Sequence, residues 1–341
     1  MDYIGIDVHK AVSTVCVLDS KGELKNELVD IPTTVNGLQR LLEIADPLDC
    51  KILFENSTRS HFVYHFLKGS EYDVTVAHST DLIAIGKSKL KTDRIDARKL
   101  AEYAMRMDLG EVQFSVCNIT DRENMMMKSL CRLNLTLVRM RADMVRKVRE
   151  YLSLQDIKMP AGYASVKSAR AIKFLEGLED PVLKNMMMTI RDLNDRVKQT
   201  ENDIERITVT DGDMKILSTF PGMGLKSAAV VVSAIDGIGR FDSPRKLVSF
   251  LGADPVTRES ASKRKKGHIS KDGDTLTRYT LRNVVIVHVY RYRNTELSQF
   301  FHRIKGRMEH SKAVMATVRK LICIIWAMLT FREPFRPLPS K

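Results

Sequence analysis

Two carboxylates in this sequence each end a short apolar run. Asp7 follows Ile-Gly-Ile, and Glu55 follows Ile-Leu-Phe. Because functional groups collect where the strands of an α/β sheet end, these two acids are expected to face one crevice. Asp93 and Asp96 stand three residues apart, a spacing that places both on one side of a helix. Together the four acids predict a site for two Mg²⁺ ions, which prefer oxygen ligands and catalyse phosphoryl transfer.

Three of these acids, taken alone, also have a structural interpretation, whereas Glu55 directly follows an apolar run and would need a partner if buried. Asp7 could accept a hydrogen bond in a turn, and Asp93 could cap the helix that follows it, which is the commoner role for such an Asp. Asp96 could pair with Arg94 or Lys99 on a solvated surface. The metal-site interpretation therefore depends on the acids being taken as an ordered set.

A second group of residues suited to chemistry lies in residues 252–271. Glycines, a proline and polar residues predict a loop here, between two helices. Ser260 lies in this segment beside a strongly basic run, and basic groups next to a hydroxyl favour attack on a phosphodiester because they neutralise the charge that develops. Alternatively, the basic residues only grip phosphates, and Ser260 and Ser262 are ordinary loop hydroxyls. The predicted nucleic-acid contacts in this segment are Lys263, Arg264, Lys265, Lys266 and Lys271.

Residues 220–226 read Phe-Pro-Gly-Met-Gly-Leu-Lys and resemble a helix–hairpin–helix loop. Glycine turns of this kind expose backbone N–H groups, and the N-terminus of the following helix can accept a phosphate. Lys226 adds a positive charge at that point and is a further predicted nucleic-acid contact. A purely structural turn is the alternative, because the motif is short.

The elements that must position these groups begin with an N-terminal region of mixed character. Residues 3–107 alternate between strand and helix signals, which predicts an α/β domain. The expected strands cover residues 3–8, 12–18, 23–31, 51–55 and 72–77, and the expected helices cover residues 35–44, 61–67 and 92–107. A polar connector follows near residues 108–120.

The remainder of the chain is expected to be helical. Residues 121–154 and 165–207 are dense in Leu, Met, Arg and Lys, and a break at 159–162 predicts a helical hairpin or coiled coil. Such a hairpin either mediates dimerisation or only packs within a bundle, since the heptad pattern is imperfect. The expected domains are residues 1–110, 121–208 and 211–333, followed by a flexible tail at 334–341.

The overall composition favours a nucleic-acid partner. The 341 residues carry a formal net charge of +13, which small-metabolite enzymes rarely need and which a phosphate backbone would balance. A basic protein with a merely solvated surface is the alternative. Five scattered cysteines without a Cys-x-x-Cys pair argue against a zinc ribbon or a disulfide framework and fit a reducing cytoplasm. No apolar run is expected to span a membrane, and residues 321–329 are expected to form a core helix.

Taken together, the motifs resemble the transposases of insertion sequence family 110, relatives of the Piv-type DNA invertases. The matching pieces follow one another in the family's order and span nearly the whole chain. They are residues 3–7, Glu55, and residues 91–97, 220–224, 250–252, 259–260, 267–271 and 281–282.

The resemblance implies an α/β N-terminal domain of the RuvC-like (ribonuclease-H-type) fold, a long helical coiled-coil hairpin and an all-α C-terminal domain. It implies that Asp7, Glu55, Asp93 and Asp96 bind Mg²⁺ (or Mn²⁺). It also implies that Ser260 attacks a phosphodiester and forms a transient phosphoserine link, which a DNA hydroxyl later resolves.

The partners that the resemblance implies are DNA and further copies of the chain, in a prokaryotic cytoplasm near the nucleoid. In such enzymes the metal site of one subunit is thought to work with the serine of another, which implies a homo-oligomer, either a dimer or a tetramer. Some members use a structured guide RNA, encoded by the element, to choose target and donor DNA.

Two departures from the family's pattern keep alternatives open. Residues 56–59 lack the glycine that usually follows the glutamate, and Ala261 stands where a glycine usually follows the serine. Losing glycine restricts the backbone. Ser262 is therefore a rival nucleophile, and a divergent or inactive copy would also fit.

The same residues are also compatible with other functional classes. One is a RuvC-like endonuclease in which Ser260 is only structural, and another is a non-catalytic nucleic-acid-binding protein with a decayed metal site. A third is an actin-like sugar kinase, since such folds open with a similar strand. The kinase fits worst, because the residues after Asp7 lack the glycine that admits a phosphate.

Overall fold

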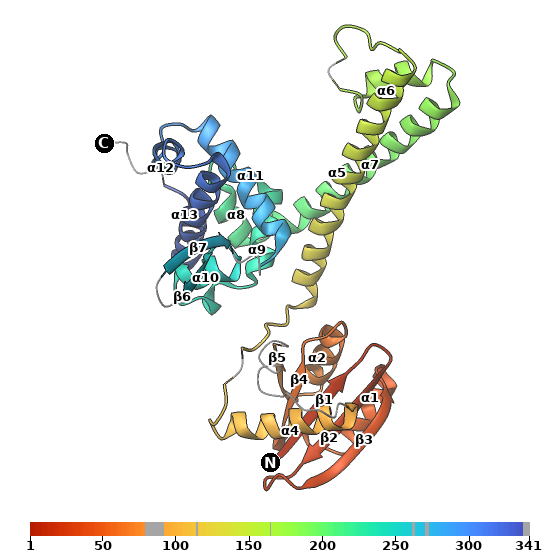
Figure 1. Cartoon of the computed structure of the whole chain (residues 1–341). Coiled ribbons are helices and arrows are strands. Elements are labelled where there is room, and N and C mark those ends of the chain that lie inside the picture. The colour runs from red at the N-terminus through yellow and green to blue at the C-terminus, as the bar shows by residue number, and fades with distance from the viewer. Residues whose placement is uncertain (79–91, 114, 164, 261–262, 270–272, 337–341) are drawn as a thin grey trace. The chain divides into compact units, whose positions relative to one another are not determined.

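The computed structural model describes residues 1–78, 92–113, 115–163, 165–260, 263–269 and 273–336, and its side chains apart from those of Leu42 and residues 255–268. The chain divides into two compact units, Met1–Asp121 and Arg122–Lys341, called unit 1 and unit 2 here (Figure 1).

Unit 1 is built on a five-stranded mixed sheet in the order β3-β2-β1-β4-β5. The strands β1 (Asp2–Val8), β2 (Val12–Leu18) and β3 (Leu24–Pro32) form an antiparallel meander. In contrast, β4 (Cys50–Glu55) runs parallel to β1, and β5 (Asp73–Ala77) runs parallel to β4. The predicted strands lie at these positions. This mixed sheet is compatible with the ribonuclease-H-type fold that the resemblance implies.

Helices pack on both faces of this sheet. On one face, α4 (Asp93–Asp108) lies across β1, β2 and β4 (Figure 1). The other face packs with α1 (Val35–Leu42) and α2 (Ser60–Gly69) in a separate core. The side chains that α4 buries recur at helical spacing and are Ala97, Leu100, Ala101 and Ala104.

Gly5 allows α4 to approach the central strand closely. A methyl group added at Gly5 would lie 2.0 Å from the carbonyl oxygen of Ala97 and 2.3 Å from the nitrogen of Ala101. Both atoms belong to the helix backbone, so a larger residue would force the helix away. This glycine therefore sets the distance between β1 and the helix that carries Asp93 and Asp96.

Unit 2 begins with two long helices packed side by side. The helices α5 (Arg122–Leu154) and α7 (Pro181–Thr208) run antiparallel. Their direction follows from cross-helix hydrogen bonds, because Asn134 bonds Thr200 toward one end and Tyr151 bonds Asp180 at the other.

The expectation of one long helix over residues 165–207 is wrong. A short helix, α6 (Ala169–Glu176), ends at Gly177, and α7 starts afresh a few residues later. Asp180 caps α7 by accepting from two backbone N–H groups, and Pro181 occupies the first helical position. Asp and Pro are strongly favoured at those positions, so the break follows from the sequence.

The remaining helices of unit 2 pack around a shared apolar core, which includes Phe220, Leu281, Val318 and Ile325. They are α8 (Gly212–Ser218), α9 (Leu225–Ile235), α10 (Pro244–Phe250), α11 (Thr275–Arg291), α12 (Glu296–Lys305) and α13 (His310–Phe331).

The helix α13 corrects the expectation that no apolar run could span a membrane. It is 22 residues long, and by length and composition alone it is long and apolar enough to cross a membrane. It nevertheless packs against α8, α10, α11 and α12, with side chains such as Val318, Leu321 and Ile325 fully buried. The buried face of α13 is part of the helical core, as expected for residues 321–329.

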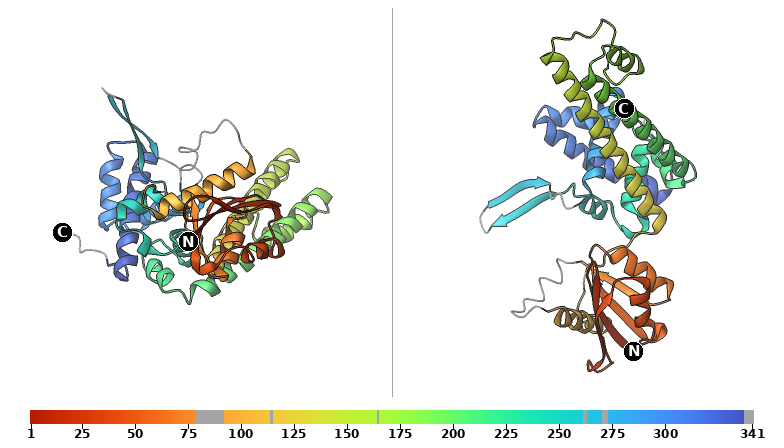
Figure 2. Two further views of the ribbon diagram at one scale, coloured as in Figure 1. Left: turned by 90° about the horizontal axis from the view of Figure 1, so that it is seen from below. Right: turned by 90° about the vertical axis from the view of Figure 1, so that its right-hand side faces the viewer.

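The expectations of a loop at residues 252–271 and of an all-α C-terminal domain are also wrong. The strands β6 (Pro255–Ser260) and β7 (Lys263–Ile269) form an antiparallel ribbon that projects from the helices of unit 2 (Figure 2). The two strands satisfy each other's backbone hydrogen bonds. A projecting ribbon needs no buried apolar face, so the sequence lacks the alternation that reveals most strands.

The last described residues pack on the helical body, which corrects the expected flexible tail for residues 334–336. The Phe335 N–H donates to Thr219 Oγ1 at 2.9 Å, and the Phe335 and Phe220 rings meet edge-on with centres 4.8 Å apart. Residues 337–341 lie outside the described residues.

Candidate metal centre and nucleic-acid interface

The strands β1 and β4 place two acids at neighbouring strand ends. The strands are parallel and Ile6 pairs with Phe54, so the next residues, Asp7 and Glu55, follow at the same edge of the sheet. Side chains alternate between the faces of a strand. Since Ile6 and Phe54 enter the core shared with α1 and α2, Asp7 and Glu55 belong to the face that α4 covers.

The first turn of α4 carries the other two acids. Thr92 caps the helix by accepting a hydrogen bond from the N–H of Ile95, so the alternative role of Asp93 as the cap is wrong. Asp93 and Asp96 continue the stripe that buries Ala97 against the sheet. The N-terminus of a helix carries partial positive charge, which favours acids in this turn.

Asp7, Glu55, Asp93 and Asp96, here called the acidic cluster, act on one another through their charges. Burial raises the pKa of Asp7 above its ordinary value; His9 opposes this, while Asp93, Asp96 and Glu55 raise it further. In the part of the chain that the structure describes, no lysine or arginine forms an ion pair with Asp7. A half-buried acid beside three other acids is poorly compensated without a cation.

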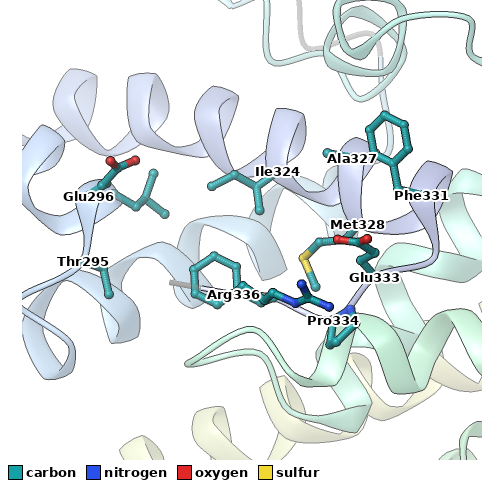
Figure 3. Close-up of a pocket in the computed structure, with 11 residues that line it drawn as sticks. Thr295, Glu296, Ile324, Ala327, Met328, Phe331, Glu333, Pro334 and Arg336 are labelled. Carbon is teal, nitrogen blue, oxygen red and sulfur yellow. The ribbon is translucent and has the colours of Figure 1, made fainter. Parts of the chain in front are cut away.

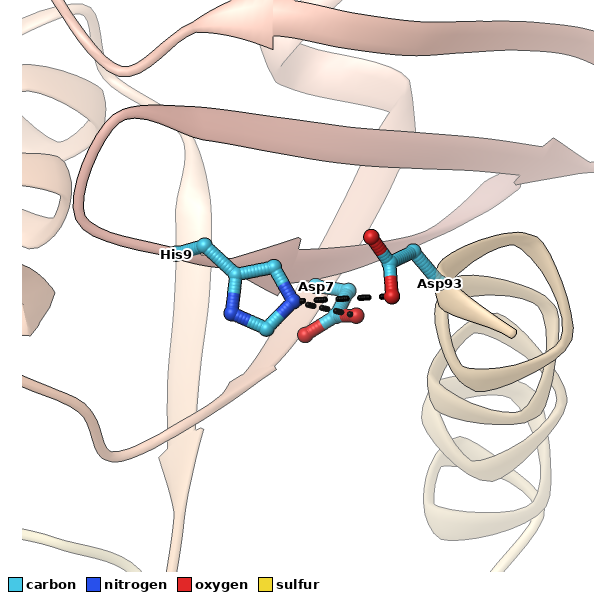
Figure 4. A group of neighbouring side chains, drawn as sticks. All are labelled: Asp7, His9 and Asp93. Carbon is cyan, nitrogen blue, oxygen red and sulfur yellow. Dashed lines mark ion pairs between the residues drawn. The ribbon is translucent and has the colours of Figure 1, made fainter. Parts of the chain in front are cut away.

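A histidine that sequence reasoning missed lies inside this cluster. His9 Nε2 is 3.2 Å from Asp7 Oδ2 and 3.7 Å from Asp93 Oδ1 (Figure 4). One donor atom from each of His9, Asp7 and Asp93 lies within 4.8 Å of the other two. The available signal was spacing, because a residue two positions after Asp7 falls on the same side of an extended chain.

Glu55 and Asp96 lie farther from the centre of the cluster. Neither belongs to the group whose donor atoms lie within 4.8 Å of one another, although both influence Asp7. Lys99 Nζ stands 3.9 Å from Asp96, which is one of the pairings expected of that acid, whereas Arg94 pairs with Glu27. The structure thus brings Asp7 and Asp93 together and leaves Glu55 and Asp96 at the margin.

The candidate serine belongs to unit 2. Ser260 is the last residue of β6, and its backbone pairs with Lys263 at the start of β7. The rival Ser262 and the predicted contact Lys271 lie outside the described residues. The other predicted basic contacts, Arg264, Lys265 and Lys266, all belong to β7.

A buried histidine holds the glycine turn that joins α8 to α9. Gly222 has a φ of +96°, a conformation that glycine adopts without strain. His288 of α11 lies with Nδ1 2.7 Å from the Pro221 carbonyl oxygen and Nε2 2.7 Å from Thr295 Oγ1. Burial lowers the pKa of His288, despite an opposing effect of the Pro221 bond, so the ring stays neutral at pH 7. The turn ahead of α9 is therefore firmly placed.

The N-terminus of α9 lies beside a hollow lined by both polar and apolar side chains. Gly224 precedes the helix and offers no side-chain cap to its first N–H groups. Lys226 lines the hollow together with Tyr279 and Asn283 of α11, and its ammonium group pairs with Glu201 at 2.7 Å. Uncapped N–H groups beside a lysine suit an anionic ligand such as phosphate.

A separate, largely apolar hollow lies beneath the last described residues of unit 2. Ile324, Met328 and Phe331 of α13 face Pro334 and Arg336 across it (Figure 3). Its lining holds two carboxylates, Glu296 and Glu333, but among the described residues only Asp7, His9 and Asp93 bring three such donor atoms within 4.8 Å of one another.

Comparison with known proteins matches the segments that contain the acidic cluster and the glycine turn to models of one family. A family model described as a transposase, of the DEDD type of IS110, matches residues 4–155. A second model, described as the transposase IS116/IS110/IS902 family, matches residues 214–302. The chain belongs to the IS110 family of transposases.

Transposases from several bacteria align with most of this IS110-family chain. The transposase for insertion sequence element IS1111A of Coxiella burnetii is 22% identical over 98% of this chain and 91% of its own length. That for IS1328 of Yersinia enterocolitica is 23% identical, covering 82% and 84% respectively. A probable family 20 transposase of Pseudomonas aeruginosa is 25% identical, covering 72% and 74%.

Membership of the IS110 family makes this protein a DNA transposase, an enzyme that recombines DNA and depends on a divalent metal ion. The acidic cluster fits such an ion on its own chemistry. Its donors are carboxylate oxygens, which hard divalent cations prefer, and their mutual repulsion leaves a positive charge to be supplied.

Proposed function

We propose that the acidic cluster binds Mg²⁺, with Asp7, Glu55, Asp93 and Asp96 as ligands, and that it forms the metal-dependent half of the transposition site. The observation that carries this proposal is the convergence of Asp7 and Asp93, whose donor atoms lie within 4.8 Å of each other and of His9. The raised pKa of Asp7, caused by burial and by the neighbouring acids, supports it. Bound divalent ions polarise a phosphodiester and activate an attacking oxygen. Mn²⁺, which accepts the same oxygen ligands, is expected to substitute for Mg²⁺.

Ser260 is the proposed nucleophile of the other half. Its Oγ forms a bond to phosphorus while the bond from phosphorus to one DNA oxygen breaks, and that oxygen leaves as a hydroxyl. A DNA hydroxyl then attacks the phosphoserine and releases Ser260. The register of the ribbon supports this role, because it sets Ser260 beside a strand of consecutive basic residues that can stabilise the transition-state charge.

The two proposed halves lie in different units of the chain, with the acidic cluster in unit 1 and Ser260 in unit 2. We propose that they come from different subunits of a homo-oligomer, either a dimer or a tetramer. The hairpin of α5 and α7 is the proposed coiled coil that spaces or joins these subunits, and it buries a polar contact between Asn134 and Thr200.

The proposed nucleic-acid interface consists of β7 and the hollow beside α9. DNA is the substrate, and a structured guide RNA encoded by the element is a proposed second ligand. The support is electrostatic: the chain has a net charge of +13, and consecutive basic residues stand on β7. Such a protein is expected to act in the cytoplasm, at the nucleoid.

Covalent trapping tests the nucleophile. The full chain is incubated with Mg²⁺ and a DNA fragment carrying the ends of its insertion sequence, and DNA-linked peptides are identified by mass spectrometry. Ser260→Ala should abolish the link, and Ser262→Ala should retain it. The reverse pattern would make Ser262 the nucleophile, and Mg²⁺-dependent nicking without any link would favour the endonuclease.

A further inference from the structure

We infer that His9 is a direct metal ligand of the acidic cluster, a nitrogen donor beside Asp7 and Asp93 that favours Mn²⁺ and similar transition-metal ions over Mg²⁺. The inference rests on the proposed metal site. It adds a donor of different chemistry to the four carboxylates.

The distances from His9 Nε2 to the two carboxylates are close to those between neighbouring ligands of one ion. Two ligands with bonds of about 2.1 Å stand about 3.0 Å apart at right angles and about 3.4 Å apart at tetrahedral angles. His9 Nε2 is 3.2 Å from Asp7 Oδ2 and 3.7 Å from Asp93 Oδ1. The Asp7 and Asp93 oxygens lie within 4.8 Å of each other, so small side-chain movements would let all three donors hold one ion.

The backbone fixes His9 at this place. Its N–H donates to the Val12 carbonyl at 3.2 Å, which closes the turn between β1 and β2. Its carbonyl accepts from Thr33 Oγ1 at 3.0 Å, and Thr33 in turn bonds Ser13 at 2.8 Å. Hydrogen bonds therefore hold the backbone of His9 in place, as a preorganised ligand requires.

Access to the ring is open. The His9 side chain is 52% exposed and that of Asp93 is 55% exposed, whereas Asp7 beneath them is 18% exposed. A hydrated ion can therefore reach the two outer donors first and then Asp7. Figure 4 shows the imidazole and the Asp93 carboxylate on either side of the Asp7 carboxylate.

The alternative is that His9 is only a counter-ion, which neutralises Asp7 and Asp93 until a metal ion replaces it. The two roles differ in a measurable way. A ligand places nitrogen in the coordination sphere, whereas a displaced counter-ion does not. Imidazole also binds the later transition metals more strongly than Mg²⁺, so a ligand role changes metal preference.

Pulsed electron paramagnetic resonance of the full chain with Mn²⁺ alone distinguishes the two roles. We expect ¹⁴N coupling to Mn²⁺ in the natural protein, lost in both His9→Ala and His9→Gln. The control variant His310→Ala, at an exposed histidine of α13, should retain it. Loss of an outer-sphere partner of a metal ligand can lower metal affinity about 10-fold. We expect His9→Ala to lower the affinity for Mn²⁺ by at least that much, and the affinity for Mg²⁺ by less.

Three results would count against this role. Mn²⁺ binding that depends on Asp7 but shows no ¹⁴N coupling would overturn the His9 inference and leave the proposed metal site standing. Coupling that persists in both His9 variants would assign the nitrogen to another residue. Absence of Mn²⁺ binding, or binding unchanged by Asp7→Asn, would contradict the proposed metal site itself.

Discussion

Asp7 occupies a position that is unfavourable when no cation is bound. Burial, Asp93, Asp96 and Glu55 all raise its pKa. When the pKa of a carboxyl is higher in the folded protein than in the unfolded chain, the group stabilises the fold at a pH below the unfolded-state pKa. That stability is lost as the pH rises through the folded-state pKa. At neutral pH the ionised Asp7 therefore lowers the free energy of unfolding of unit 1, as is common for groups retained for function.

Replacing Asp7 by Asn should stabilise the metal-free protein. Asp7→Asn removes the charge and keeps the shape, so we expect unit 1 to gain about 1 kcal/mol in the presence of EDTA, seen as a higher Tm. Divalent ions should raise the Tm of the natural protein more than that of the variant. Asp73→Asn, at an exposed acid at the start of β5, is the control and should change little. A destabilised Asp7→Asn protein would argue against charge repulsion at this site.

His288 should make unit 2 sensitive to acid. Its folded pKa is lowered below the ordinary 6.5, so stability is fully present above pH 6.5 and declines as the pH falls from there toward the folded value. Urea denaturation at about pH 7.5 and about pH 5.5 measures this loss. We expect His288→Gln to lose less stability than the natural protein between these two conditions. An equal loss in both proteins would assign the acid sensitivity elsewhere.

The acids of the candidate site could be selected from the sequence, but their partner histidine could not. Asp7 and Glu55 follow apolar runs, and Asp93 and Asp96 share a helical face, so local patterns marked all four. The only local signal for His9 is its position two residues after Asp7, and its contact with Asp93 joins it to a residue far along the chain. Contacts of that kind depend on how closely α4 approaches the sheet, and local patterns do not encode that distance.

At the scale of elements, the contact of α4 with β1 links the fold to the candidate site. We expect Gly5→Ala to lower the free energy of unfolding by about 1–3 kcal/mol, because the new methyl group meets helix backbone. Mn²⁺ binding should weaken as well, since α4 carries Asp93 away from Asp7. Gly69→Ala is the matched control, with no atom within 4 Å of the added group. Denaturant titration and Mn²⁺ titration of both variants measure the two effects, and equal behaviour of the variants would refute the link.

The basic strand β7 should contribute to DNA affinity mainly through phosphate contacts. Lys265→Ser combined with Lys266→Ser removes two positive charges, so the slope of log K against log salt should become shallower by about 1–2 units. Lys173→Ser with Lys184→Ser, at exposed lysines of α6 and α7, removes the same charge from another surface and should change the slope less. Equal effects of the two pairs would show that only net charge matters.

Local patterns predicted most elements of unit 1 and fewer details of unit 2. The strands of unit 1 contain β-branched residues that must be buried, so composition revealed them. The ribbon of β6 and β7 lacks that signal, because its strands satisfy each other's hydrogen bonds without entering a core. The break between α6 and α7 was visible in principle, since Asp180 and Pro181 form a helix start within an otherwise helical run.

At the scale of the whole molecule, the proposed site draws on both units. If the acidic cluster of one subunit works with Ser260 of another, two inactive variants should complement each other. Asp7→Asn and Ser260→Ala chains are mixed and allowed to exchange subunits. If the chains pair at random in dimers, about a quarter of the composite sites should contain both an intact acidic cluster and Ser260. DNA strand transfer measures the recovery. No recovery despite demonstrated subunit exchange would place both halves of the site in a single chain.

The metal centre is tested most directly by an anomalous difference map from crystals of the full chain that contain Mn²⁺. We predict a peak between Asp7 and Asp93, with His9 Nε2 among the atoms that coordinate it. Mn²⁺ bound elsewhere on the chain, with the acidic cluster empty at concentrations that support strand transfer, would contradict the assignment of this cluster as the catalytic metal site.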